Sequence, residues 1–448
     1  MPRRFSDLRV VAAVPGVGWF AGVDRAFADA VIPAFEQLGV AVRTISLDEW
    51  HDPKLRETAI SSLQSFEPHF AVSLPNGAYG LLFRDRGTNL FKDLLGVPLV
   101  LPWDHLLTQA PAHVLDQRQL EQIPPRAGAL RDLRSALEGP LLRQYVSDSG
   151  HRDVYESLGI LSVGSTRRYM PAAHSHFVKA GLQRTSPSVR GRIGFAGNIY
   201  TARGAQLQIL NHPLLRQIDD IVRAAKKQNW KISGWHLLCQ ALDRVPQSMR
   251  ESLGLTPDYA LFWRIALDLL SYRVNTEFRL AVLNAITQPI DFFGNFADPD
   301  SSSELEKSGH IRYCDAADFR TELPKVFASY ELWVDATNAP FINGCGSKVF
   351  DCFAAGSFML IDYREDVLTE IGDIALSFMY GSAEELRDKV GFYQTHPEKR
   401  REIIEQMQAI ITERLTREHF YERVCADMSA ELGVKDALSS AAPATDKI

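Results

Sequence analysis

The sequence predicts an α/β protein of two domains, each built on a doubly wound parallel sheet, with a cleft between them. Short apolar runs alternate with amphipathic segments along both halves of the chain. These runs lack a polar alternation, which indicates strands covered on both faces, as in parallel sheets. A basic stretch rich in Ser, Pro and Gly, residues 181–192, separates the two halves. Such a composition is typical of a linker between domains.

The first predicted domain spans residues 1–180. Apolar residues at helical spacing, including Phe27, Val31 and Phe35, predict a helix from about residue 24 to 38, which ends at Gly39. The apolar runs that predict strands are residues 8–14, 40–45, 70–74, 97–101 and 159–164.

The second predicted domain spans residues 193–436. Its predicted strands are residues 192–198, 289–294, 332–335 and 357–362, and residues 397–432 are typical of two charged amphipathic helices. Residues 205–285 are strongly helical in composition and predict a helical insertion, where Trp235, Phe262 and Trp263 fit helix packing better than a ligand platform. The polar tail, residues 437–448, is expected to be disordered.

The composition excludes several classes of protein. The 448 residues include 49 Lys and Arg against 55 Asp and Glu, and this net charge of −6 disfavours broad binding to nucleic acid. The longest apolar run, residues 10–23, is shorter than the roughly 18 residues that a membrane-spanning helix needs. Five scattered cysteines without a CxxC pair indicate reduced thiols and a cytoplasmic protein.

The first candidate motif follows the strand at 192–198. Ligands of open parallel sheets bind beyond the carboxyl ends of the strands, so candidate residues are expected in the loops there. Gly197 and Asn198 end the strand and allow a bulky anion to approach the backbone, and Arg203 offers a guanidinium suited to phosphate. The alternative is a tight turn with a solvent-exposed arginine.

The second motif follows the strand that ends at Asp335. A loop with Gly344 and Gly346 leads into a helix that begins near Ser347, with Lys348 in its first turn. Amides at a helix start, together with a lysine, can form a pyrophosphate cradle. Asp351, one turn later, is placed to accept hydrogen bonds from ribose hydroxyls. The alternative is a serine helix cap with ordinary turn glycines.

This second motif also carries a resemblance to a known family. The segment from Ser347 to Gly356, followed by the apolar residues 359–362, resembles a signature of the group-1 glycosyltransferases of the spore-maturation-protein (CgeB-like) type, which are relatives of the family-4 enzymes. Residues 381–386 and 393–401 resemble the segments that follow it. Residues 97–105 and 169–173 resemble elements of the family's first domain.

The resemblance implies the GT-B architecture, in which two Rossmann-like domains hold a nucleotide-sugar donor and its acceptor. By position, Asp351 stands where related enzymes have the glutamate that binds ribose, and Asn343 stands at the first glutamate of their Glu-x7-Glu pair. Lys348 stands where the family commonly has arginine. All three are departures, of which Lys348 keeps the positive charge and Asn343 loses a negative one.

A third motif lies on the acceptor side, in the loop after the strand at 97–101. Asp104 and His105 are adjacent there and are candidates to orient an acceptor hydroxyl. An aspartate helix cap next to a surface histidine is an equal alternative. Asp298 and Asp300 form a DxD spelling, but their Ser-rich loop predicts a solvated segment. The resemblance to GT-B enzymes, which generally do without a DxD metal, implies no metal, and we expect no cofactor because the nucleotide sugar is a substrate.

The leading hypothesis is therefore a metal-independent glycosyltransferase with a nucleotide-sugar donor, UDP-sugar foremost. Its acceptor is a glycan, a protein or a small molecule, and kinship with family 4 implies retention of anomeric configuration. An epimerase or hydrolase of nucleotide sugars on the same fold is a second hypothesis. A non-catalytic protein that binds a nucleotide sugar or serves as a scaffold is a third.

Overall fold

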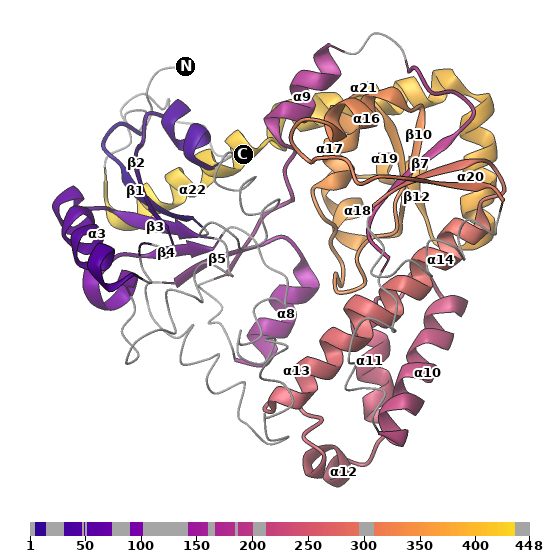
Figure 1. The fold of residues 1–448 in the computed structure, drawn as a ribbon, viewed down its shortest axis with the longest axis horizontal. Helices are drawn as coiled ribbons and strands as arrows, with labels where there is room; N and C mark the ends of the chain where they lie inside the picture. Colours follow the sequence, from indigo (N-terminus) through magenta and orange to yellow (C-terminus); the bar gives the residue numbers. More distant parts are fainter. Residues whose placement is uncertain are drawn as a thin grey trace, which may run out of the picture.

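The protein consists of two α/β halves, each with a six-stranded sheet in which every neighbouring pair is parallel (Figure 1). This confirms the predicted fold class. The computed structural model describes residues 5–14, 31–46, 49, 52–73, 90–101, 142–159, 166–183, 187–199, 212–294 and 309–434.

The first sheet has the strand order β2-β1-β3-β4-β5-β6. Its strands are β1 (Arg9–Val14), β2 (Ala41–Ser46), β3 (Phe70–Ser73), β4 (Leu99–Leu101), β5 (Leu142–Val146) and β6 (Thr166–Arg168). The first four match the apolar runs. Strand β5 contains Arg143 and Gln144, which hide it from a search for apolar runs. Of the strand predicted at 159–164, Gly159 lies in the turn after helix α8, and residues 160–164 lie outside the described residues.

Helices cover the first sheet on both faces. They include residues 31–37, α3 (Pro53–Phe66), the π-helical segment η1 (Leu90–Leu95) and α8 (Ser149–Ser157). Aspartates cap two of them: Asp52 accepts from Lys54 N at the start of α3, and Asp148 accepts from His151 N at the start of α8. Helix α9 (Ser175–Leu182) follows β6 and leads toward the second half.

The second sheet has the strand order β12-β11-β10-β7-β8-β9. Its strands are β7 (Ile193–Ala196), β8 (Ile290–Phe293), β9 (Ile311–Cys314), β10 (Leu332–Val334), β11 (Phe358–Asp362) and β12 (Met379–Tyr380). The edge strands β9 and β12 carry no clear apolar run and were not predicted. The chain passes from β7 outward through β8 and β9 and then returns to β10 on the other side of β7. The order therefore reverses between β7 and β10, which is where doubly wound sheets bind their ligands.

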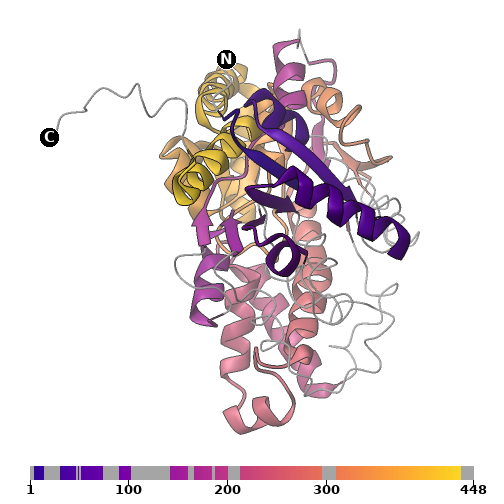
Figure 2. The same cartoon turned by 90° about the vertical axis from the view of Figure 1, so that its left-hand side faces the viewer.

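The predicted helical insertion is present between β7 and β8. It comprises α10 (Pro213–Gln228), α11 (Gly234–Asp243), α12 (Gln247–Ser252), α13 (Ala260–Leu267), the π-helical segment η4 (Asp268–Val274) and α14 (Asn275–Ala285). These helices project from the second sheet in Figures 1 and 2. Trp235, Phe262 and Trp263 are buried and pack on one another, with ring centroids 5.2–6.1 Å apart. Their interpretation as core residues is confirmed.

The remaining helices flank the second sheet. They are α16 (Leu323–Ser329), α17 (Lys348–Ala354), α18 (Glu365–Ile371), α19 (Ile374–Phe378), α20 (Ala383–Thr395) and α21 (Pro397–Arg414). Helix α20 begins with a variant of the capping box: Ser382 Oγ accepts from Glu385 N, while Glu385 accepts from the N–H of Gly381, one residue before the cap. This box accounts physically for the Gly-Ser-Ala-Glu-Glu segment that carried part of the family resemblance.

The last helix, α22 (Arg417–Leu432), packs on the first sheet rather than the second (Figure 1). Phe420 and Tyr421 lie in the same apolar cluster as Phe35, and Phe420 contacts Tyr145 at 5.5 Å between ring centroids. The chain therefore crosses between the halves twice. The predicted assignment of residues 193–436 to a single domain does not anticipate this return.

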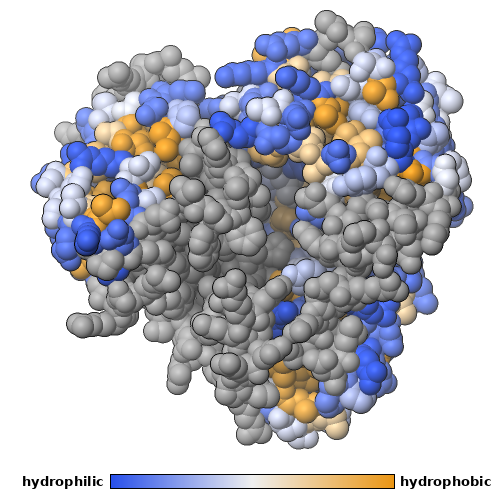
Figure 3. Space-filling view, viewed as in Figure 1, coloured by the Kyte–Doolittle hydropathy of each residue, from blue (hydrophilic) through white to orange (hydrophobic). Residues whose placement is uncertain are grey.

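Apolar surface is scattered over the described residues. The large apolar side chains that are exposed, Leu55, Leu182, Met249, Leu376, Phe392 and Leu432, come from six different helices. The hydrophobic colour on the face drawn in Figure 3 is likewise broken into separate patches. Within the part of the chain that the structure describes, no helix is both long and apolar enough to cross a membrane.

Candidate functional site

The candidate site lies where the order of the second sheet reverses. Gly197 and Asn198 follow β7, and residues 335–347, the β10–α17 loop, follow β10. Strands β7 and β10 pair in parallel, with Val334 opposite Phe195, so both loops leave the same edge of the sheet. The structure thus brings together the two strand-end motifs that the sequence singled out.

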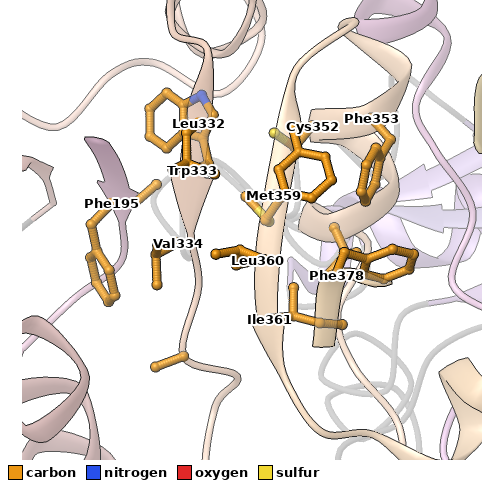
Figure 4. Close-up of a cluster of buried hydrophobic side chains, with 14 of the residues drawn as sticks. Phe195, Leu332, Trp333, Val334, Cys352, Phe353, Met359, Leu360, Ile361 and Phe378 are labelled. Carbon is orange, nitrogen blue, oxygen red and sulfur yellow. The ribbon is translucent and has the colours of Figure 1, made fainter. Parts of the chain in front are cut away.

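Helix α17 is held in place by its apolar face. Val349, Phe350, Cys352 and Phe353 are buried. Figure 4 shows Cys352 near Met359 of β11, and Phe353 next to Phe378 of α19, with 5.0 Å between the two ring centroids. Because this face is fixed on the sheet, the first turn of α17 and the loop before it have a defined position above the strand ends.

Lys348 joins the two strand ends. Its Nζ donates to the carbonyl oxygen of Ala196, the last residue of β7, at 2.6 Å, and forms an ion pair with Asp335, which directly follows β10. The Lys348 side chain keeps 28% of its exposure, whereas the Asp335 side chain keeps 5%. A partly exposed cation therefore lies at the point where a ligand of this sheet is expected.

Arg279 of α14 is a second cation at the same edge. Its guanidinium donates to the carbonyl oxygen of Asn198 and to Asn338 Oδ1, at 3.2 Å for the latter, so it also bridges the loops after β7 and β10. The side chain is almost completely buried. Arg279 was not predicted from the sequence, because its helix carries no motif. A charged residue in the otherwise apolar stretch of a helix is the signal that was available.

Buried polar contacts fix the shape of the β10–α17 loop. Asp362 at the end of β11 accepts from Thr337 N at 2.8 Å and pairs with Arg364. Arg364 donates in turn to the carbonyl oxygen of Phe341 at 3.2 Å. Tyr380 donates through its hydroxyl to the backbone carbonyl of Asp335 at 2.6 Å. These groups support the loop from beneath.

The structure does not give Asp351 the role that the sequence predicted. Its carboxylate is fully buried and accepts from the backbone N of His174 at 2.8 Å and from the His174 ring at 3.0 Å. A ribose hydroxyl cannot reach it in this arrangement. His174 itself lines a cavity of about 400 Å³ together with Arg320 and Arg417. Through His174, Asp351 therefore holds the chain that enters α9.

Asp148 of the first half occupies part of the predicted amide cradle. Its carboxylate accepts from Ile342 N at 2.7 Å, Gly344 N at 3.0 Å and Asn343 N at 3.1 Å. Burial by itself favours the neutral acid, but the charge of His151 and these three amides outweigh it, so the pKa of Asp148 is lowered. The Gly344 amide donates to this carboxylate and is not available to a diphosphate, which corrects the sequence prediction for that residue.

The other predicted residues divide into two groups. Asn343 lies at the contact between the halves, where its Nδ2 donates to Ser149 Oγ at 3.1 Å, while Gly346 has open space around the position of a Cβ atom. Asp104, His105, Arg203 and the Asp298–Asp300 pair lie outside the described residues. Within the described residues, no three His, Cys, Asp or Glu side chains gather as a metal site would require.

The structural position of Asp351 leads to a first prediction. Asp351→Ala removes the acceptor for a buried N–H and a buried ring, and should lower the free energy of unfolding by about 1–3 kcal/mol in urea titrations. Nucleotide affinity of the folded variant should change by less than about threefold, since separate sites act almost independently. Asp351→Asn keeps one acceptor oxygen and is the milder control. A tenfold loss of affinity at unchanged stability would contradict this prediction and support the ribose contact predicted from the sequence.

Comparisons with known proteins support the fold of the chain. Residues 283–430 match a protein-family model described as glycosyl transferase-like. A search of curated proteins returned no match to the chain. Among solved structures, a glycosyltransferase from Rickettsia africae superposes with a TM-score of 0.52 at 7% identity, covering 96% of this chain and 99% of that one.

Two further structures have the same arrangement. Sucrose-phosphate synthase from Thermosynechococcus elongatus gives a TM-score of 0.52 at 10% identity, covering 96% of this chain and all of that one. HepE of Anabaena, in complex with UDP and glucose, gives 0.50 at 11% identity, covering 94% of this chain and all of that one. At such identities the likeness is one of fold. The chain therefore has the two-domain GT-B fold found in glycosyltransferases. Residues 283–430, about a third of the chain, are glycosyl transferase-like in sequence.

Proposed function

We propose that this protein is a glycosyltransferase that transfers a sugar from a nucleotide-sugar donor to an acceptor. The observation that carries the proposal is Lys348, a partly exposed cation that bridges β7 and β10 at the reversal of strand order. Sheets of this kind bind nucleotides at that position. The glycosyl transferase-like sequence of residues 283–430 includes this lysine and its loop.

Sugar transfer needs a group that stabilises the departing diphosphate as negative charge builds on it. A preorganised cation in a site with little water performs this task well. We assign it to Lys348, whose ion pair with Asp335 and bond to Ala196 fix the ammonium group before a donor arrives. The amides of Gly346 and Ser347, and Arg203, are the further proposed contacts of the diphosphate.

The acceptor side and the stereochemistry are part of the same proposal. Asp104 and His105 are the proposed residues that orient the acceptor hydroxyl, which comes from a glycan, a protein or a small molecule. Kinship with family-4 enzymes supports a retaining reaction, and the residues around Lys348 resemble the CgeB-like branch. Since Lys348 and Arg203 are proposed to supply the positive charge in place of a metal ion, we expect sugar transfer to continue when EDTA is present.

The donor is proposed to be a UDP-sugar. HepE of Anabaena has the same fold and was crystallised with UDP and glucose and with UDP-glucose, which supports this choice of base.

A thermal-shift panel with UDP, GDP, dTDP and CDP tests the proposal. A nucleotide that binds the folded protein at 100 times its Kd stabilises it by about 2.7 kcal/mol, and UDP should give the largest rise in Tm. If no nucleotide raises Tm at millimolar concentration, the protein is better described as a scaffold. Incubation with a labelled donor and no acceptor then separates transfer from epimerisation, because an epimerase isomerises its donor unaided.

A further inference from the structure

The contact of Asp148 with the second half resembles the binding of an anion in a nest of amides. Three consecutive N–H groups, from residues 342–344, converge on one carboxylate. Successive amides of this kind form a concave anion site that usually receives a phosphate or carboxylate ligand. Here the anion is supplied by the other half of the same chain, from the short connection between β5 and α8.

Two glycines allow the halves to approach this closely. A Cβ atom on Gly344 would lie 2.8 Å from the carbonyl oxygen of Ser147, and one on Gly150 would lie 2.4 Å from the Ile342 side chain. Real Cβ atoms essentially never show contacts under 3.0 Å. Both positions therefore require a residue without a side chain, and the surfaces on either side of Asp148 are complementary.

Neighbouring groups continue the same contact. Asp366 of α18 accepts from Ser149 N at 2.8 Å and pairs with Arg168 at 3.3 Å. The His151 ring lies 3.0 Å from the carbonyl oxygen of Pro340 through Nε2 and stacks on the Phe341 ring. The start of α8 thus packs on the middle of the β10–α17 loop, and this loop ends at Ser347, directly before Lys348.

We propose that Asp148 is a positioning residue that gives the β10–α17 loop its donor-binding shape only when the two halves are closed on each other. The inference rests on the proposed function for its role in donor binding. The carboxylate does not touch the donor; it orders the loop whose far end presents Lys348. Closure of the two halves therefore also orders the loop that forms the diphosphate site.

Asp148→Asn separates this role from the capping of α8. Oδ1 of Asp148 accepts from His151 N at the start of α8, and asparagine caps a helix as well as aspartate does. Oδ2 accepts from Ile342 N and Gly344 N, and an amide NH₂ at that position would face two donors. The matched control is Asp52→Asn, which changes the cap of α3 in the same way on an exposed helix.

The experiment measures closure and donor binding separately. Spin labels at Leu55→Cys and Met249→Cys, on a Cys239→Ser and Cys314→Ser background, report the distance between the halves without any ligand; both label sites are exposed. Asp148→Asn should lengthen and broaden this distance, and should raise the KM for the donor about tenfold while kcat at saturation changes little. Asp52→Asn should match the parent protein in both.

Two results would overturn the proposal that Asp148 positions the loop. Unchanged distances in Asp148→Asn overturn the proposal. A fall in kcat at constant KM also overturns it, because that pattern indicates a smaller folded fraction rather than a misplaced loop. If the parent protein neither binds nucleotide nor transfers sugar, the proposed function fails, and the distance measurement still shows whether Asp148 closes the halves.

Discussion

Replacing Lys348 with methionine is expected to lower nucleotide affinity by at least about tenfold and turnover by roughly 10²–10³, because the cation that faces the diphosphate is lost. Titration calorimetry with UDP and initial rates with a UDP-sugar measure the two effects. Lys348→Arg is the matched control. It keeps the charge, and arginine is the residue expected at this position from the family resemblance, so it should retain most of the affinity.

The same substitution also affects stability, and a second variant separates the two effects. Without Lys348 the buried carboxylate of Asp335 loses its partner, at a cost of about 3–5 kcal/mol. Adding Asp335→Asn removes that uncompensated charge, so the double variant should recover most of the stability without recovering nucleotide affinity. If the folded double variant binds UDP as the parent does, Lys348 is not a diphosphate contact.

Gly294→Ala is expected to destabilise the second half by about 3 kcal/mol or more, which is at the upper end for overpacking. A Cβ atom at this position, directly after β8, would lie 1.7 Å from the carbonyl oxygen of Gly197. Both contacting groups belong to strand ends, so no side chain can rotate to make room. The displaced segment is the one that carries Gly197 and Asn198, and nucleotide affinity should fall as well.

Gly391→Ala provides the matched control for this substitution. Gly391 lies within α20 and lacks a positive φ, and a Cβ atom added to it would have no neighbouring atom within 4 Å. Alanine there should raise stability by roughly 0.5–1 kcal/mol, because it lowers the entropy of the unfolded chain. Urea denaturation of both variants measures the difference. Equal stabilities would show that the strand ends can separate without cost.

The fold was largely predictable because its central strands are covered on both faces. Apart from an end residue in β1, β3 and β11, strands β1, β3, β7 and β11 are apolar runs, and such runs identify parallel strands directly. Strand β5 was missed because Arg143 reaches the sheet surface and pairs with Glu431 of α22. Its polarity is explained by a partner almost three hundred residues away, which no local pattern records.

The candidate site was predictable only in part, for a similar reason. The position of Lys348 follows from a strand, a glycine-containing loop and a helix that are consecutive in the sequence. The roles of Asp148, His174 and Arg279 depend on contacts between distant segments: Asp148 with residues 342–344, His174 with Asp351, and Arg279 with Asn338. The residue types were predictable from the sequence. Which charges are already paired within the fold was not, because the partners lie far apart in the sequence.

The return of α22 to the first sheet has a consequence for the order of folding. Phe420, Tyr421, Val424, Cys425 and Met428 complete the apolar cluster that begins with residues 5–12. Synthesis proceeds from the N-terminus, and domains generally fold as units in that order. Here part of the apolar core of the first sheet stays exposed until residues 417–432 leave the ribosome. The half that is made first is thus the last to be finished.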